Sequence, residues 1–180
     1  GEGLVIAGEE NPNVVVLCAD LTESTRSEAF AKKFPDRFFE VGVAEQNLAT
    51  IASGLGVSGK IPFISSYATF SPGRNWEQIR TTVSYNDSNV KVAGAHAGIS
   101  VGPDGATHQA IEDIATMRVM ANMKVLTTNV KKLVKSVIIK LQGERNCSCK
   151  DALKYAIMTS PKAINPKTKK KLELLVEKYI

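Results

Sequence analysis

Four side chains with acid–base chemistry stand where short apolar runs of the sequence end. Asp20 and Glu45 each come after such a run, and both histidines of the chain, His96 and His108, lie in one Gly-rich stretch. A carboxyl group in an apolar setting can act as a general acid or base, and an imidazole moves protons near pH 7. The two carboxyl residues also have a purely structural alternative. A loop Asp often caps a helix, and a Glu in a first helical turn often interacts favourably with the helix dipole. Their common location at strand ends favours a site.

The apolar pattern predicts the elements that would bring these residues together. Val14–Ala19 is a continuous apolar run, which is typical of a strand buried on both faces of a parallel sheet. Further strands are predicted over 38–41, 61–64, 90–95 and 123–126, and helices over 1–7, within 22–34, from 44 to 55, over 76–85 and over 108–118. This alternation predicts an α/β fold, a parallel sheet with helices on both faces, in which sites gather at the carboxyl ends of the strands.

The charge distribution divides the chain into two parts. Residues 126–180 hold 13 Lys and Arg against 4 Asp and Glu, whereas residues 1–125 hold 10 against 14. We therefore expect a domain over 1–126 and a basic, mainly helical tail over 127–180, with helices over 130–141, 150–158 and 167–179. The tail lacks the aromatic interleaving of nucleic-acid binders, and no apolar run approaches the roughly 20 residues that span a bilayer. Neither nucleic acid nor a membrane is an expected partner.

The cysteines indicate neither disulfides nor zinc. The chain has three, and Cys147 and Cys149 stand two positions apart with no further cysteine or histidine nearby, so they cannot complete a four-ligand zinc site. We expect free thiols and a reducing, cytoplasmic location.

Four motifs in order carry a family resemblance. They are Ala19–Ser24 (ADLTES), Phe39–Asn47 (FEVGVAEQN), Ser66–Phe70 (SYATF) and Gly102–Gln109 (GPDGATHQ). Over residues 1–125 the chain resembles the pyrimidine-binding domain of transketolase, above all the C-terminal subunit of transketolases that are split into two chains. The resemblance implies the thiamine diphosphate-binding fold. It ends at residue 125, and the tail does not match.

The resemblance implies a catalytic role for Glu45 and a cofactor-binding role for two aromatic residues. Glu45 matches the carboxyl group that meets N1′ of the aminopyrimidine of thiamine diphosphate and acts as a proton relay. Phe70 and Tyr67 match the aromatic pair at that ring, where stacking contributes roughly 0.5 to 1.5 kcal/mol beyond burial. Ordinary core packing is the alternative for both rings, and we expect Trp76 and Tyr85 in the core.

The resemblance also implies a substrate site and a contact near the cofactor. His96, Asp104 and His108 match positions that bind the hydroxyls or lie near the phosphate of a sugar phosphate, and both histidines would move protons there. Ser24 resembles a contact for the substrate phosphate, although a serine there could equally cap the next helix. Asp20 resembles a residue near the cofactor and the subunit interface.

The chain has only half of the expected cofactor site. In this family Mg²⁺ and the diphosphate are held by a Gly-Asp-Gly pattern followed by Asn-Asn, and the chain contains neither. We therefore expect a diphosphate-binding partner subunit that holds the metal, a homodimer contact or an α₂β₂ assembly, and no activity of the chain alone. The leading hypothesis is half of a transketolase that transfers a two-carbon ketol unit between sugar phosphates. The alternatives are an inactive fragment or fusion with an assembly or regulatory role, and a deoxyxylulose phosphate synthase-type enzyme.

Overall fold

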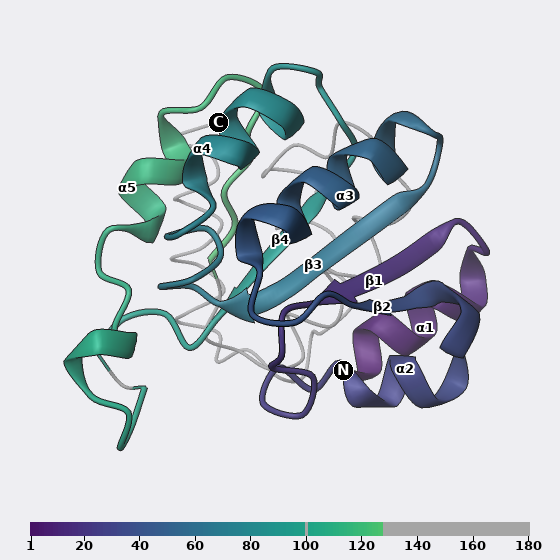
Figure 1. Ribbon diagram of the computed structural model, residues 1–180, viewed down its shortest axis with the longest axis horizontal. Coiled ribbons are helices and arrows are strands. Elements are labelled where there is room, and N and C mark those ends of the chain that lie inside the picture. The colour runs from purple at the N-terminus through teal and green to yellow at the C-terminus, as the bar shows by residue number, and fades with distance from the viewer. Residues whose placement is uncertain (100, 128–180) are drawn as a thin grey trace, which may run out of the picture. The chain divides into compact units, whose positions relative to one another are not determined.

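A four-stranded parallel sheet forms the centre of the fold. The computed structural model describes residues 1–99 and 101–127 (Figure 1). The strands are β1 (Val14–Cys18), β2 (Phe38–Glu40), β3 (Ile61–Tyr67) and β4 (Lys91–Ala95), in the order β2-β1-β3-β4. All three pairings are parallel, so the carboxyl ends of the four strands meet at one edge.

Helices flank this sheet, as the sequence predicts. Figure 1 shows α3 and α4 over one face and α1 and α2 against the other. The helical segments are α1 (Glu2–Glu10), α2 (Glu28–Lys33), a 3₁₀ turn (Pro35–Arg37), α3 (Glu45–Val57), α4 (Trp76–Gln78), a π-helical turn (Ile79–Ser84), a 3₁₀ turn (Ala106–His108) and α5 (Asp113–Arg118). The predicted α/β fold class is confirmed.

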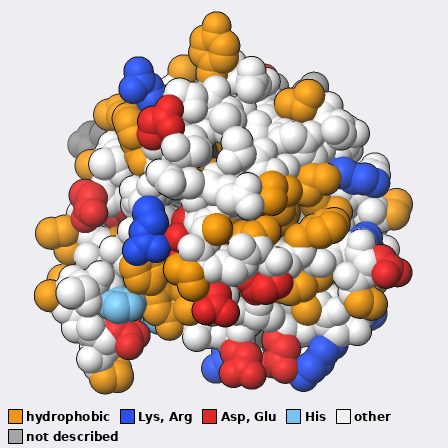
Figure 2. Space-filling model, in the orientation of Figure 1, with side chains coloured by type: hydrophobic (Ala, Val, Ile, Leu, Met, Phe, Trp, Pro, Cys, Tyr) orange, Lys and Arg blue, Asp and Glu red, His pale blue; other side chains and the backbone are white. Residues whose placement is uncertain are grey.

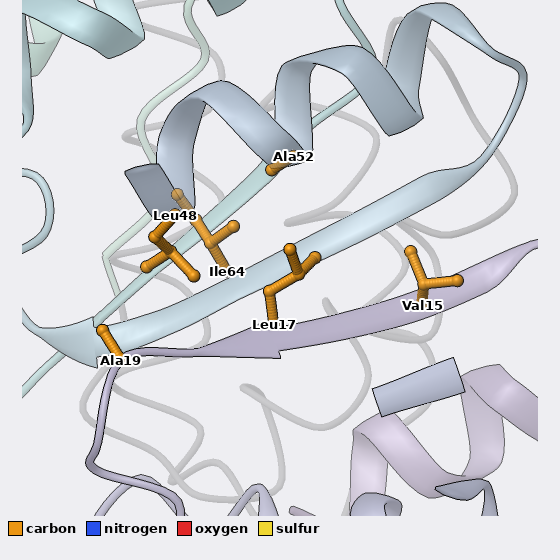
Figure 3. Close-up of a cluster of buried hydrophobic side chains, with 6 residues drawn as sticks. All are labelled: Val15, Leu17, Ala19, Leu48, Ala52 and Ile64. Carbon is orange, nitrogen blue, oxygen red and sulfur yellow. The ribbon is translucent and has the colours of Figure 1, made fainter. Parts of the chain in front are cut away.

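The core explains the uninterrupted apolar run of β1. Alternate residues of a strand point to opposite faces, so a strand covered on both sides needs apolar residues at every position. On one face Val15, Leu17 and Ala19 pack with residues of α3 and β3 (Figure 3), namely Leu48, Ala52 and Ile64. All five residues of β1 are buried. The contact with α3 fixes the helix whose first residue is Glu45.

Three sequence predictions are wrong in detail. No helix spans 108–118, because the chain turns out of the 3₁₀ turn at His108, runs extended at Gln109 and enters α5 only at Asp113. Residues 123–126 form no strand, since a short apolar run interrupted by Lys124 also suits an extended segment without a strand neighbour. Tyr85 is 85% exposed rather than buried, because the wider π turn before it shifts side-chain positions from those of a regular helix.

The described residues belong mainly to one of two units. Unit 1 comprises Gly1–Met123 and unit 2 comprises Lys124–Ile180. The predicted tail helices, Cys147 and Cys149 lie outside the described residues, and the division at 126/127 stays a prediction. Among the described residues, no helix has the length and apolar character needed to cross a membrane.

The buried face of α3 predicts a large stability difference between two truncations on one helix. Leu48 is fully buried in the cluster of Figure 3, whereas Val57 is 65% exposed. Leu48→Ala should lower the free energy of unfolding by about 2–5 kcal/mol, because it leaves a cavity. Val57→Ala should change it by less than about 0.5 kcal/mol. Urea denaturation of the two purified variants checks this, and equal effects would contradict the packing of α3.

Candidate active site at the carboxyl edge of the sheet

Glu45 is the first residue of α3, and its side chain is buried. The residue is only 3% exposed. Arg74 donates from Nη1 to Oε2 of Glu45 at 2.8 Å, and Asn75 donates from Nδ2 to the backbone oxygen of Glu45 at 2.8 Å. Asn75 is itself fully buried and also donates to Oγ of Ser71 at 3.1 Å. Two consecutive residues therefore hold the side chain and the backbone of Glu45.

A tight turn after β3 aims Arg74 back at α3. The amide of Gly73 donates to the oxygen of Ala68 at 3.0 Å, and the amide of Arg74 donates to the oxygen of Phe70 at 2.9 Å. A Cβ at residue 73 would stand 2.1 Å from the backbone oxygen of Thr69. Only glycine fits this close approach, so Gly73 is what permits the turn.

Two aromatic rings and both imidazoles form a cluster beside this turn, which we call the ring cluster. Its members are Tyr67, Phe70, His96 and His108. The ring centroid of Tyr67 lies 4.2 Å from that of His96 and 6.1 Å from that of His108, and Phe70 lies 5.2 Å from His108. The guanidinium of Arg74 lies over Phe70, 4.7 Å from its centroid. Arg74 thus connects the Glu45 carboxylate with the ring cluster.

The loop that carries both histidines folds back on itself. Ala97 and Ala110 form an isolated bridge, and the amide of Gly98 donates to the oxygen of Ala110 at 2.7 Å. His96 has a φ of +54°, a left-handed conformation that L-residues seldom adopt outside sites that require it. Asp104 is exposed in the same loop, and its carboxylate makes no hydrogen bond or ion pair within the described residues. The structure therefore brings the histidines together and leaves Asp104 facing solvent.

Glu40 organises the loops that follow β1 and β2. Its Oε1 accepts from the amides of Asp20 at 2.7 Å and Gly42 at 3.0 Å, and its Oε2 accepts from Oγ1 of Thr22 at 2.7 Å. Asp20 is exposed with a φ of +58°, and Ser24 is exposed. Within the described part of the chain, no side-chain contact joins Asp20 or Ser24 to the ring cluster.

Sequence reasoning missed three residues that hold the site, which are Arg74, Asn75 and Glu40. Pro72–Gly73 indicates a turn, and a turn directly after a strand end could have pointed to the residues that follow it. Glu40 lies inside one of the four motifs, but two of its three acceptor contacts are with Asp20 and Thr22, which lie 20 and 18 residues earlier in the sequence.

The candidate site reaches the surface. His96 is exposed, and Tyr67, Phe70 and His108 are half-buried. Figure 2 shows histidine (pale blue) at the surface, bordered by hydrophobic (orange) and acidic (red) side chains. Among the described residues, no three His, Cys, Asp or Glu side chains gather as a metal site would require.

The fold and these contacts define an α/β domain with a buried carboxylate, two imidazoles and two aromatic rings at the carboxyl edge of a parallel sheet. A family model described as the transketolase pyrimidine-binding domain matches residues 1–170. The chain belongs to this family. The match extends to residue 170, so the expectation that the resemblance ends at residue 125 and leaves the tail unmatched is wrong.

Relatives and a solved structure agree with this membership. The chain is 51% identical over 138 residues to a transketolase C-terminal section of Methanocaldococcus jannaschii, which covers 77% of this chain and 44% of the relative. It is 38% identical over 124 residues to one of the subunits of an apulose-4-phosphate transketolase of Actinobacillus succinogenes. This alignment covers 69% of this chain and 40% of the relative. The structure of a split-gene transketolase, an inactive beta4 tetramer, superposes with a TM-score of 0.70 at 46% identity, covering 81% of this chain and 46% of that one. The chain thus spans less than half the length of these proteins.

The contacts of Glu40 predict the local order of two loops. Glu40→Ala removes the acceptor of the Asp20 and Gly42 amides, and a hydrogen bond contributes about 0.5–1.5 kcal/mol net. We expect amide hydrogen exchange at both positions to rise by about 2- to 10-fold. The control is Glu28→Ala, which removes only a surface ion pair with Lys32. Unchanged exchange in Glu40→Ala would show that other contacts hold these loops.

Proposed function

We propose that this chain is the pyrimidine-binding half of a thiamine diphosphate-dependent transketolase. With a separate diphosphate-binding subunit, it would transfer a two-carbon ketol unit between sugar phosphates in the cytoplasm. The observation that carries the proposal is the buried carboxylate of Glu45, connected through Arg74 to an aromatic surface and two imidazoles. Membership in the transketolase family supports the same reaction class.

The residues present suit the aminopyrimidine of thiamine diphosphate. This flat heterocycle needs an aromatic face and a carboxyl group at its ring nitrogen N1′. Phe70 is half-buried, which leaves part of its ring accessible, and Oε1 of Glu45 has no hydrogen-bond partner within residues 1–99 and 101–127. Two buried polar atoms of neighbouring residues, Oγ of Ser66 and Oδ1 of Asn75, also have no partner in the described part. These features leave hydrogen-bonding capacity for a ligand at this edge.

Each candidate residue then has a defined task. When bound, thiamine diphosphate supplies the carbon nucleophile that takes up and passes on the two-carbon unit. Glu45 holds the proton at N1′, and Phe70 and Tyr67 bind the ring by stacking. Of the remaining candidates, His96 and His108 exchange protons with substrate oxygens, Asp104 orients a hydroxyl, Ser24 binds the phosphate and Asp20 supports the cofactor and the subunit interface.

The rest of the site is assigned to a partner. The chain covers 40–46% of three transketolase proteins, and one of these is by name a single subunit of its enzyme. We therefore propose that a diphosphate-binding subunit holds Mg²⁺ and the diphosphate, with an α₂β₂ assembly or a homodimer contact completing the site.

Reconstitution tests the function. The chain is mixed with the diphosphate-binding subunit of the same organism, thiamine diphosphate, Mg²⁺ and a ketose phosphate and aldose phosphate pair. Glu45→Gln keeps the shape of the side chain but cannot relay a proton, so two-carbon transfer should fall by about 10²- to 10⁴-fold. Glu28→Gln, at a side chain that is 45% exposed and pairs with Lys32, should keep full activity.

Two results would contradict the proposal. Full activity of Glu45→Gln would remove the proton relay from this residue. A wild-type assembly that forms but transfers nothing would favour an inactive family member. Product analysis separates ketol transfer from formation of a deoxyxylulose phosphate.

A further inference from the structure

We infer that Arg74 is a positioning residue for Glu45, which binds one carboxylate oxygen and leaves the other for N1′ of the cofactor. The inference rests on the proposed function and adds to it a residue on the turn that follows β3. The four motifs that carry the family resemblance do not include this residue.

The first argument is charge. A buried carboxylate is costly unless a counter-ion and hydrogen bonds compensate it. Glu45 is 3% exposed, and within the described residues Arg74 is the one cation within ion-pair distance of it. The Arg74 side chain is 49% exposed, so its own desolvation is partial. The ion pair with Arg74 therefore allows the Glu45 carboxylate to stay charged at a moderate desolvation cost.

The second argument is the way in which the pair is made. Arginine often binds a carboxylate in a bidentate manner, with two parallel hydrogen bonds that occupy both oxygens. Here Nη1 donates to Oε2 alone, and Oε1 accepts no hydrogen bond from the described residues. An ionised carboxylate has about four acceptor positions, so one oxygen remains available to accept a hydrogen bond from a protonated N1′ while the other stays paired with Arg74.

The third argument is that the same guanidinium packs on Phe70. It lies 4.7 Å from the ring centroid, a cation–π distance. A heterocycle bound at this site must meet the carboxylate and the aromatic face at once. Arg74 fixes these two groups relative to each other, which a lysine ammonium, lacking a planar face, could do only in part.

The fourth argument is the rigidity of the backbone beneath Arg74. Gly73 allows the tight turn before it, and fully buried Asn75 after it donates to the backbone oxygen of Glu45. The Cα of Arg74 is thus anchored to the residue that its side chain orients. Such preorganisation reduces the cost of ordering a site when the ligand binds.

The test compares cofactor binding in the assembled complex of this chain with its diphosphate-binding subunit. Titration calorimetry measures Kd for thiamine diphosphate with Mg²⁺ present. Arg74→Met keeps an unbranched side chain but removes the charge, and we expect Kd to rise by about 10-fold, as for loss of a charged hydrogen bond. Arg74→Lys should recover part of this loss. The matched control is Arg80→Met, which removes a guanidinium lying 5.7 Å from the Trp76 ring centroid, and it should bind as the wild type does.

A cofactor analogue with carbon in place of N1′ distinguishes positioning from general support of the fold. If Arg74 acts through the hydrogen bond between Glu45 and N1′, Arg74→Met should raise Kd for the analogue by less than about 3-fold, because the analogue cannot form that hydrogen bond. An equal loss with both ligands would overturn the inference, as would unchanged or tighter binding of thiamine diphosphate by Arg74→Met. Failure of the wild-type complex to bind thiamine diphosphate at all would instead overturn the proposed function.

Discussion

A buried carboxylate at the beginning of α3 is the constraint on which the candidate site depends. Glu45 can remain charged there because Arg74 pairs with its side chain and Asn75 holds its backbone oxygen. Breaking a buried pair by removing one partner typically costs several kcal/mol, and the half-exposed arginine places this pair below that range. The turn after β3 and the start of α3 are therefore energetically linked, although they lie about 30 positions apart in the sequence.

The sheet topology explains why distant residues meet. In a parallel sheet with the order β2-β1-β3-β4, the carboxyl ends of β3 and β4 are neighbours. Tyr67 ends β3 and His96 follows β4, and their rings lie 4.2 Å apart. The loop after β4 closes on itself and brings His108 to Phe70. The ring cluster is thus a consequence of strand order together with one closed loop.

The sequence predicted the fold and part of the site for physical reasons that differ between elements. The apolar run of β1 has a single simple explanation, so its strand and the carboxyl-edge position of Asp20 were predictable. The break at Gln109 and the π turn over Ile79–Ser84 were not, because the extended segment and the π turn depend on tertiary contacts rather than on periodicity. Arg74 was not predicted because its partner Glu45 lies 29 residues away, and Glu40 was not predicted because two of its three partners lie 18 and 20 residues away. The roles of the site residues toward cofactor and substrate stay predictions.

A crystal structure of the chain with its diphosphate-binding subunit, thiamine diphosphate and Mg²⁺ would test the central claim most directly. The distance to be measured runs from Oε1 of Glu45 to N1′ of the aminopyrimidine. We expect a hydrogen bond of about 2.7–3.0 Å, with Nη1 of Arg74 still on Oε2 and the pyrimidine against Phe70. A pyrimidine bound elsewhere, or a Glu45 carboxylate with both oxygens engaged by Arg74, would contradict the account.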